Sequence, residues 1–312
     1  MKKLILAVLL SLSTAVLAQS NTIKIVVPYP PGGPTDVMAR SIQKELSASM
    51  KKNVVVENHP GASTTIGATL VANANHNETV LLVNTSTTYI NLMTKKSIGH
   101  NENQLVPLVY LGNCPTVLIV SPKLGIKNFD EFKKLNIGRS LNFGSSGVGS
   151  TSSFQAVHLQ KYLNKDYTEI PYKGASPIMV DLISGNIDFA FVNYPTALPF
   201  IESKKVVPIA IYANHQVIEL PNVPDYTKLG IPYPGDINWY MIWSNQNINF
   251  DDQRQIQEIM TRVAKDPTKL KIFKDQGLTI SPKTIIPTKE FVINFKQNTA
   301  RLLEYIGYRS QE

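Results

Sequence analysis

Short apolar runs alternate along the chain with segments whose apolar residues recur every three or four positions. The first series of apolar runs lies at residues 23–29, 53–57, 80–84 and 105–121, and the last is long enough for two strands. Between the first two runs, apolar residues recur at every fourth position from Met38 to Met50, which is typical of a helix with one buried face. Strands that alternate with helices predict an α/β fold with a mostly parallel sheet.

The same pattern starts again in the second half of the chain. Apolar runs at residues 141–143, 168–172, 189–193 and 206–212 alternate with predicted helices at residues 151–163 and 177–184. Ser176 and Pro177 form a typical helix start, and Gly185 stands where that helix should end. The repeated series predicts a second lobe with its own mostly parallel sheet.

The last third of the chain changes character. Proline and glycine are frequent between Gln216 and Gly235, which predicts a loop. An aromatic strand at residues 239–243 and helices at about 251–263 and 288–306 follow without a new strand series, so we expect them to return to the first lobe. Two crossings, near Pro122 and near Asn238, would form a hinge. They divide the chain into lobe 1 (21–118 plus 238–312) and lobe 2 (119–237).

The N-terminus has the features of a secretory signal. Lys2 and Lys3 precede an apolar run at residues 4–12, and small residues suit cleavage after Ala18. The run is too short to cross a bilayer. We therefore expect residues 1–18 to be a signal peptide and the remaining chain to be a soluble periplasmic protein. Cys114 lies far from the cleavage site, so neither a lipid anchor nor an internal disulfide is expected.

Charge and composition exclude several classes of partner. The formal charge of the 312 residues is +8, and two of the positive charges belong to the predicted signal. The lysines are scattered, which indicates a solvated surface with a mild attraction for anions. Nucleic-acid binding is not expected, because the sequence has no arginine-rich face with interleaved aromatic residues. Five dispersed histidines and one cysteine predict no metal site, and we expect no cofactor.

Two glycine-rich loops each follow an apolar strand and precede a predicted helix. The first runs from Val27 to Asp36 (VPYPPGGPTD) and the second from Asn142 to Ser150 (NFGSSGVGS). Glycine lets the backbone approach a ligand closely, and the start of a helix favours an anion. One loop in each half of the chain predicts a single ligand held between two lobes.

The second loop also has features of enzyme motifs. Gly144, Gly147 and Gly149 resemble a dinucleotide cradle, but their spacing is the reverse of G-x-G-x-x-G. The loop also differs from the G-x-S-x-G turn of hydrolases, because its second glycine is misplaced. No nucleophile and base are evidently paired. An exported α/β enzyme that acts on a small organic acid is the alternative function, and substrate turnover distinguishes it from a receptor.

Four segments resemble the Bug family, the extracytoplasmic solute receptors of tripartite tricarboxylate transporters. They are residues 25–40, 56–62, 142–153 and 171–174. The sequence departs from the family pattern at Ser63, Thr64 and Thr65, where the family often has further glycine, and at residues 75–81. The first departure adds hydroxyl groups beside the expected cleft and can alter ligand choice.

The resemblance implies a bilobal periplasmic-binding-protein fold of the second type, a Venus flytrap. It implies a monomeric receptor, not an enzyme, that captures a small carboxylate for a membrane transporter or a sensor domain. Family receptors hold carboxylates with backbone amides, hydroxyls and ordered water. By resemblance, the ligand-binding residues are Tyr29, Pro31, Gly32, Gly33, Thr35 and Asp36 in lobe 1, and Ser145, Ser146, Gly147, Gly149 and Ser150 in lobe 2.

Several of these candidates have a second interpretation. Asp36 lies in a first helical turn, so its carboxylate either stabilises the helix end, which we favour, or meets a ligand ammonium group. Ser150 either contacts the ligand or caps the helix behind its loop. Asn193 lies at a strand end, where open α/β sheets bind ligands, and is a further ligand-binding candidate. Lys173 favours a surface position, and His158 is interpreted as packed.

Overall fold

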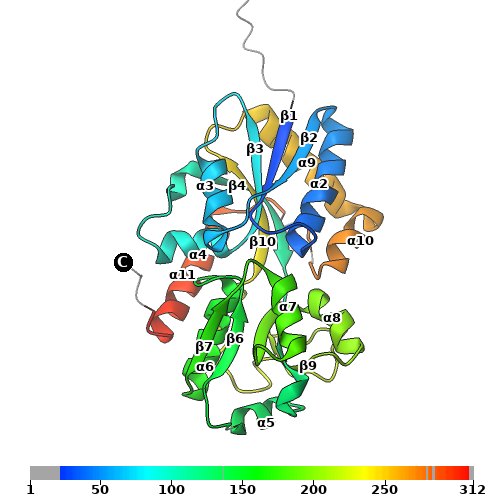
Figure 1. The fold of residues 1–312 in the computed structure, drawn as a ribbon. Helices are drawn as coiled ribbons and strands as arrows, with labels where there is room; N and C mark the ends of the chain where they lie inside the picture. The colour runs from blue at the N-terminus through cyan, green and yellow to red at the C-terminus, as the bar shows by residue number, and fades with distance from the viewer. Residues whose placement is uncertain (1–21, 136, 279, 283–284, 309–312) are drawn as a thin grey trace, which may run out of the picture.

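The computed structural model describes residues 22–135, 137–278, 280–282 and 285–308. Two α/β lobes lie one above the other in Figure 1, each around a five-stranded sheet. The strand order is β2-β1-β3-β10-β4 in lobe 1 and β7-β6-β8-β5-β9 in lobe 2. The expectation of two α/β lobes is therefore confirmed. The predicted signal peptide lies outside the described residues.

The sheet of lobe 1 is mixed, and not mostly parallel as the sequence predicted. Its strands are β1 (Thr22–Val27), β2 (Asn53–Asn58), β3 (Thr79–Thr85), β4 (Leu105–Asn113) and β10 (Trp239–Asn245). Strand β1 pairs in parallel with β2 and β3, whereas β10 runs antiparallel between β3 and β4. Because β10 arrives from a distant part of the sequence, it completes the sheet only after lobe 2 has been traversed.

Helices cover both faces of this sheet (Figure 1). They are α2 (Pro34–Met50), α3 (Thr65–Ala72), α4 (Thr87–Thr94), α9 (Phe250–Lys265) and α10 (Pro267–Asp275), with short 3₁₀ helices η1 (Ala62–Thr64) and η2 (Glu102–Gln104). Helix α2 buries Met38, Ile42 and Leu46 in the core, as its fourfold spacing predicts. Helix α9 packs against α2 and β4.

Lobe 2 repeats this architecture. Its strands are β5 (Thr116–Val120), β6 (Leu141–Ser145), β7 (Tyr167–Pro171), β8 (Phe189–Asn193) and β9 (Val207–Tyr212), and its helices are η3 (Pro122–Leu124), α5 (Phe129–Lys134), α6 (Thr151–Leu163), α7 (Ala175–Ser184) and α8 (Tyr194–Glu202). Strand β5 is antiparallel to both of its neighbours, and β6 is parallel to β7 and β8. Val217, Leu220 and Val223 of the proline-rich segment pack in the core of lobe 2.

The first crossing between the lobes differs from the expectation. The apolar run at 105–121 forms two strands in different sheets, joined by Cys114 and Pro115. The crossing therefore lies before Pro122, and residues 116–118 belong to the sheet of lobe 2. The backbone N–H of Cys114 donates to the carbonyl of Asn238 (3.0 Å), and the Asn238 side chain donates to the Cys114 carbonyl (2.7 Å). These bonds join the two crossing segments, which we propose form the hinge.

The sequence predicted that helix α11 (Lys289–Tyr305) returns to lobe 1, but the helix contacts both lobes. Phe295 packs edge-on against Trp239 at the start of β10, with ring centroids 4.8 Å apart. Tyr305, at the other end of the helix, packs against His158 of lobe 2 at 5.4 Å. His158 is buried, which agrees with its interpretation as packed, and burial lowers its pKa to about 4.

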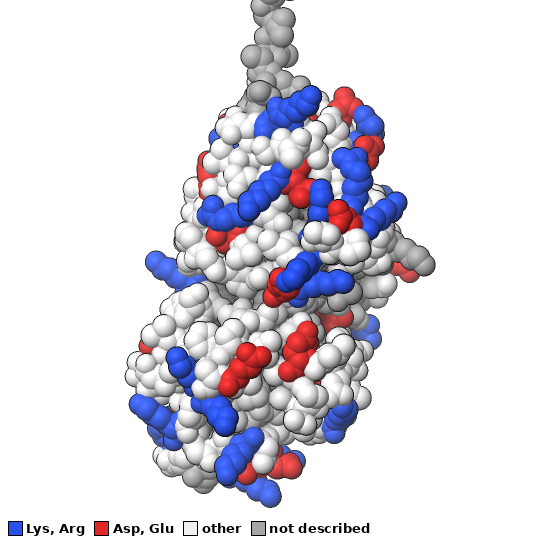
Figure 2. Space-filling view, turned by 90° about the vertical axis from the view of Figure 1, so that its right-hand side faces the viewer, with Lys and Arg blue, Asp and Glu red and all other residues white. Residues whose placement is uncertain are grey.

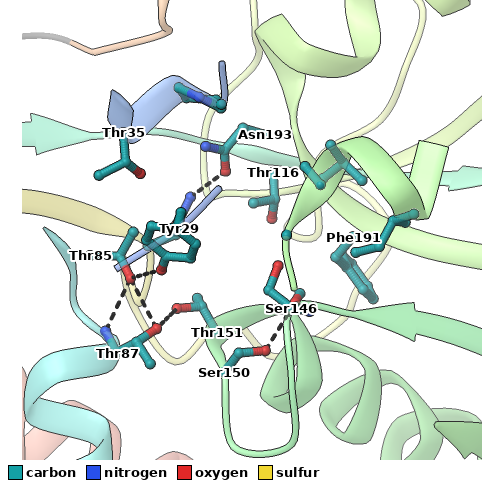
Figure 3. Close-up of a pocket in the computed structure, with 18 of the residues that line it drawn as sticks. Tyr29, Thr35, Thr85, Thr87, Thr116, Ser146, Ser150, Thr151, Phe191 and Asn193 are labelled. Atoms are coloured by element: carbon teal, nitrogen blue, oxygen red, sulfur yellow. Dashed lines mark hydrogen bonds between the residues drawn. The ribbon is translucent and has the colours of Figure 1, made fainter. Parts of the chain in front are cut away.

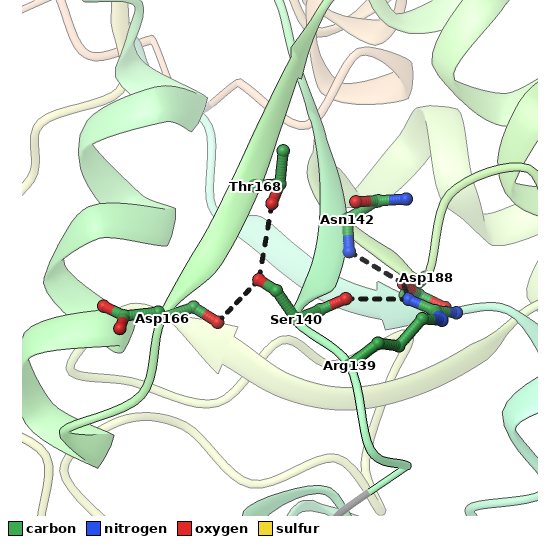
Figure 4. Close-up of polar contacts among 6 residues, drawn as sticks. All are labelled: Arg139, Ser140, Asn142, Asp166, Thr168 and Asp188. Carbon is green, nitrogen blue, oxygen red and sulfur yellow. Dashed lines mark hydrogen bonds and ion pairs between the residues drawn. The ribbon is translucent and has the colours of Figure 1, made fainter.

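Charged residues of both signs are interspersed over the face seen in Figure 2. Several ion pairs of the described residues contain a buried carboxylate, and that of Asp188 lies in lobe 2. It accepts two hydrogen bonds from the Arg139 guanidinium (2.6 and 2.7 Å) and one from the Asn142 backbone N–H (2.7 Å; Figure 4). Asp188 therefore fastens the start of β6 to the start of β8.

Asp188→Ala is expected to lower the free energy of unfolding by about 1–3 kcal/mol, because it leaves the Asn142 N–H without its acceptor. Urea unfolding of the purified protein measures the change. Asp166→Ala is the matched control: Asp166 is exposed, and its backbone carbonyl accepts the bond from Ser140 in the same cluster. We expect the control to change stability by less than about 0.5 kcal/mol. Equal losses in the two variants would contradict this role of Asp188.

Candidate functional site

A cavity of about 150 Å³ lies between the lobes, and we call it the interlobe cavity. Figure 3 shows Tyr29 and Thr35 of lobe 1 on one side and Ser146, Ser150 and Thr151 of lobe 2 on the other. The lining residues are Tyr29, Pro30, Pro31, Gly33, Pro34, Thr35, Thr85, Thr87, Thr116, Ser146, Ser150, Thr151, Ser152, Gln155, residues 174–178, residues 191–193, Asn238 and Tyr240. None of them carries a formal charge. A cavity of this size holds a molecule about as large as benzene.

The first glycine-rich loop contributes one wall of this cavity. Tyr29, Pro31, Gly33 and Thr35 line it, as predicted for ligand-binding residues. The Tyr29 hydroxyl lies 3.2 Å from the Thr85 hydroxyl, and burial raises the pKa of Tyr29, so the phenol is a neutral hydrogen-bonding group. No side chain caps α2 at Gly33, which leaves the first N–H groups of this helix without a capping oxygen.

Asp36 and Gly32 do not line the interlobe cavity. The buried Asp36 carboxylate accepts hydrogen bonds from the Gly32 N–H (3.0 Å), the Arg40 guanidinium (2.9 Å) and the Asn58 amide (3.0 Å). Asp36 therefore stabilises the helix start, which is the role that the sequence favoured, and its carboxylate does not face a ligand. It also holds Gly32, whose φ of +85° is a conformation that glycine adopts at low cost.

Asp36→Asn is expected to destabilise the protein at neutral pH by about 1.5–3 kcal/mol, the range for hydrogen bonds to charged groups. Burial acts to raise the pKa of Asp36, but hydrogen bonds from Arg40, Gly32 and Asn58 hold it below its ordinary value of 3.8. A carboxylate whose pKa is lowered in the folded state stabilises that state at pH values above its ordinary pKa. This contribution is lost as the pH falls through the lowered pKa.

Urea unfolding at pH 7 and pH 3 tests this linkage. The difference in the free energy of unfolding between wild type and Asp36→Asn should be smaller at pH 3 than at pH 7. Asp251→Asn is the control, since Asp251 lies in the first turn of α9 but its side chain is 70% exposed. A difference for Asp36→Asn that is as large at pH 3 as at pH 7 would rule out the linkage.

The second glycine-rich loop contributes the opposite wall. Ser146 and Ser150 line the cavity, and Ser150 also caps α6 by accepting the Ser153 N–H at 3.3 Å. The two interpretations of Ser150 are therefore compatible. Ser145 does not line the cavity. Its buried hydroxyl donates a hydrogen bond to the Glu169 carboxylate and accepts one from the Gly147 N–H (3.1 Å). Gly149 does not line it either. Ser145 and Gly149 shape this loop.

Gly147 faces lobe 1 at the mouth of the cleft and not the interlobe cavity. A Cβ atom added at Gly147 would lie 2.7 Å from the Ser63 hydroxyl. That hydroxyl donates to the Val148 carbonyl at 2.7 Å, so a hydrogen bond joins the lobes here. The hydroxyls that replace glycine in the family pattern thus adjoin the cleft, as expected. Ser63 and Thr64 have φ of +51° and +75°, which is uncommon for residues other than glycine.

A second hollow, the side cavity, adjoins this contact. It shares Tyr29 and Ser146 with the interlobe cavity and is lined further by Ser63, Gly147 and Lys173. Tyr172 also lines it, while its hydroxyl donates to the Asp181 carboxylate at 2.6 Å. Lys173 therefore lies at the cleft mouth and does not line the interlobe cavity.

Sequence reasoning missed several lining residues. Thr85 ends strand β3 and Thr87 begins α4, and the polar run at the end of an apolar strand was a signal that could have found them. The Thr87 and Thr151 hydroxyls lie 3.2 Å apart and connect the lobes. Thr116 and Gln155 had no such signal. Asn193 was predicted from its strand end and does line the cavity, where it accepts a hydrogen bond from Asn238 (2.8 Å).

Within the described ranges, no group of three or more His, Cys, Asp or Glu residues is arranged to hold a metal ion. In the same ranges, no helix is both long and apolar enough to cross a membrane.

Comparison with known proteins connects this geometry to a family. The profile described as "Tripartite tricarboxylate transporter family receptor" matches residues 38–308. Protein BugT of Bordetella pertussis is 27% identical over 293 residues, which cover 92% of this chain and 90% of BugT. These matches extend over both lobes.

Two solved structures have the same fold. Periplasmic binding protein BugD has a TM-score of 0.82 and 24% identity, covering 93% of this chain and 99% of BugD. MatC from Rhodopseudomonas palustris, solved with bound malate, has a TM-score of 0.80 and 23% identity, covering 91% of this chain and 98% of MatC. The bilobal periplasmic-binding-protein fold is thereby confirmed, and the chain belongs to the tripartite tricarboxylate transporter receptor family.

Proposed function

We propose that the protein is a periplasmic receptor that captures a small carboxylate in the interlobe cavity. The observation that carries this proposal is the lining itself, in which hydroxyl and amide groups from two lobes surround a volume of about 150 Å³ without any charged side chain. The uncapped start of α2 adds N–H groups that favour an anion. Malate bound to MatC, a protein with the same fold, supports the ligand class.

The same lining argues against the alternative, an exported enzyme acting on a small organic acid. A serine or threonine nucleophile needs a neighbouring base, and none of the described residues that line the interlobe cavity is His, Asp, Glu, Lys or Cys. The Thr87 hydroxyl is hydrogen-bonded to the hydroxyls of Thr85 and Thr151. The receptor therefore holds its solute and releases it unchanged.

The closed receptor then presents the solute to membrane subunits of a tripartite tricarboxylate-type transporter or to a periplasmic sensor domain. Residues 1–18 direct export as a signal peptide, and the mature chain acts as a monomer. These parts of the proposal rest on the sequence of the N-terminus and on the family to which the chain belongs.

A thermal-shift screen of residues 19–312 tests the proposed function. Mono-, di- and tricarboxylates, acidic and neutral amino acids and aromatic acids form the panel. A ligand that binds only the native state raises the melting temperature. We expect one group of acids to raise it and to be recovered unchanged by NMR. Conversion of the acid would favour the enzyme, and the absence of a shift with every acid would contradict carboxylate capture.

A further inference from the structure

Gln155 is a buried amide in the wall of the interlobe cavity. It lies on α6 one helical turn beyond Thr151, and only 1% of its surface is exposed. Both its side-chain oxygen and its side-chain nitrogen lack a hydrogen-bond partner among the described residues. Buried polar atoms in native proteins are nearly always paired, and each one left unpaired costs about 1–3 kcal/mol.

Thr116 has the same property in another element of lobe 2. It begins β5, lines the cavity and is 4% exposed, and its hydroxyl also has no partner within the described part of the chain. By contrast, the Thr151 hydroxyl is already bonded to Thr87. Two elements of lobe 2 thus bring unpaired donors and acceptors to the cavity wall.

The surroundings of these groups restrict what can pair with them. Ile178 and Phe191 line the same cavity, and no lining residue carries a positive charge. Lys173 lines the side cavity instead. The uncapped start of α2 supplies N–H groups for one carboxylate, whereas Gln155 and Thr116 offer only uncharged side chains. A second carboxylate buried beside them would pay a large desolvation cost without a counter-charge, whereas a neutral group that donates and accepts can pair with an amide at little cost.

We propose that Gln155, together with Thr116, forms a specificity subsite for the end of the solute remote from its carboxylate. The subsite takes a neutral hydrogen-bonding group, such as a hydroxyl or a carboxamide. The preferred solute is then a short monocarboxylic acid with a neutral polar tail, and a dicarboxylate binds more weakly. This inference rests on the proposed function, because it assigns the second end of a ligand whose first end is a carboxylate.

Calorimetry with three acids of similar length tests the subsite. Succinamate carries a carboxamide tail, succinate a second carboxylate and pentanoate an apolar tail. For the wild-type protein we expect succinamate to bind at least about tenfold more tightly than either of the others, which corresponds to one hydrogen bond to a buried partner. Preference for succinate would overturn the inference.

Gln155→Leu supplies the decisive comparison, since leucine keeps much of the volume but removes both polar atoms. We expect the variant to lose the preference for succinamate over pentanoate, while pentanoate binds as it does to the wild type or more tightly. A purely structural role of Gln155 would weaken all three acids equally and leave their ratios unchanged. That result would also overturn the inference.

Thr116→Val is the second variant, because valine matches threonine in shape, and it provides the test if Gln155→Leu does not fold. Thr116→Val should reduce the ratio of the succinamate affinity to the pentanoate affinity by a smaller factor than Gln155→Leu does. An unchanged ratio would contradict the subsite. If none of the three acids binds the wild-type protein but longer acids do, the corresponding amide and diacid pairs replace them. Binding of carboxylates with unaltered ratios in the variants refutes the subsite alone, whereas no binding of any carboxylate refutes the proposed function.

Discussion

Gly147→Val is expected to weaken ligand binding at least about 100-fold while the chain still folds. The new Cβ would lie 2.7 Å from the Ser63 hydroxyl, which is held by its hydrogen bond to the Val148 carbonyl. Ser63 cannot yield easily, because its backbone is already in the left-handed region and the Asn91 amide donates to its carbonyl at 2.7 Å. The variant therefore prevents the lobes from closing, and affinity falls with the population of the closed form.

Gly149→Val is the matched control for this variant. Gly149 lies in the same loop with φ of +77°, so valine is strained there as well, but the nearest atom to an added Cβ is Lys95 Cε at 3.9 Å. Calorimetry should show a much smaller loss of affinity in the control, and melting temperatures should show similar destabilisation in both. An equal loss of affinity in the two variants would mean that strain in the loop, and not blocked closure, weakens binding.

Gly33→Val is expected to abolish binding by a different route. Gly33 lines the interlobe cavity in extended backbone, with φ of −79° and ψ of 169°, which any residue can adopt. An added Cβ has ample space, because its nearest neighbour is the Pro30 carbonyl oxygen at 3.9 Å. Valine should therefore leave the fold intact and fill part of a cavity of only about 150 Å³.

Substitutions of increasing size at Gly33 distinguish filling of the interlobe cavity from loss of the fold. We expect Gly33→Ala to weaken binding by a smaller factor than Gly33→Val, since it adds one carbon instead of three. The melting temperature without ligand should stay close to that of the wild type in both variants. Wild-type affinity in Gly33→Val would show that the ligand does not occupy this cavity.

The alternation of strands and helices predicted both lobes because each element buries one apolar face or run. The same signal concealed the crossing at Cys114 and Pro115, where β4 and β5 form one continuous apolar run that carries no information on which sheet each half joins. Helix α11 illustrates the same limit. Its apolar face is visible in the sequence, but the sequence does not say that Phe295 and Tyr305 cover different lobes.

The candidate site could be predicted where local chemistry marks it. Glycine and proline identify both loops, and Tyr29 and Ser146 in them line the interlobe cavity. The orientation of individual residues could not be predicted, since Gly147 meets Ser63, which lies in the other lobe and far away in the sequence. Gln155 lies inside a helix and resembles a surface residue until the packing around it is known.

Interlobe distances measured by pulsed electron resonance test the central claim most directly. Spin labels at Lys44→Cys on α2 and Val180→Cys on α7 report on the two lobes, since both positions are exposed. Cys114 is buried, and burial raises the pKa of its thiol, so it should not react with the label. We expect a bound carboxylate to shift the distances to one shorter, narrower population. Unchanged distances at saturating acid would show that the ligand is not captured between the lobes.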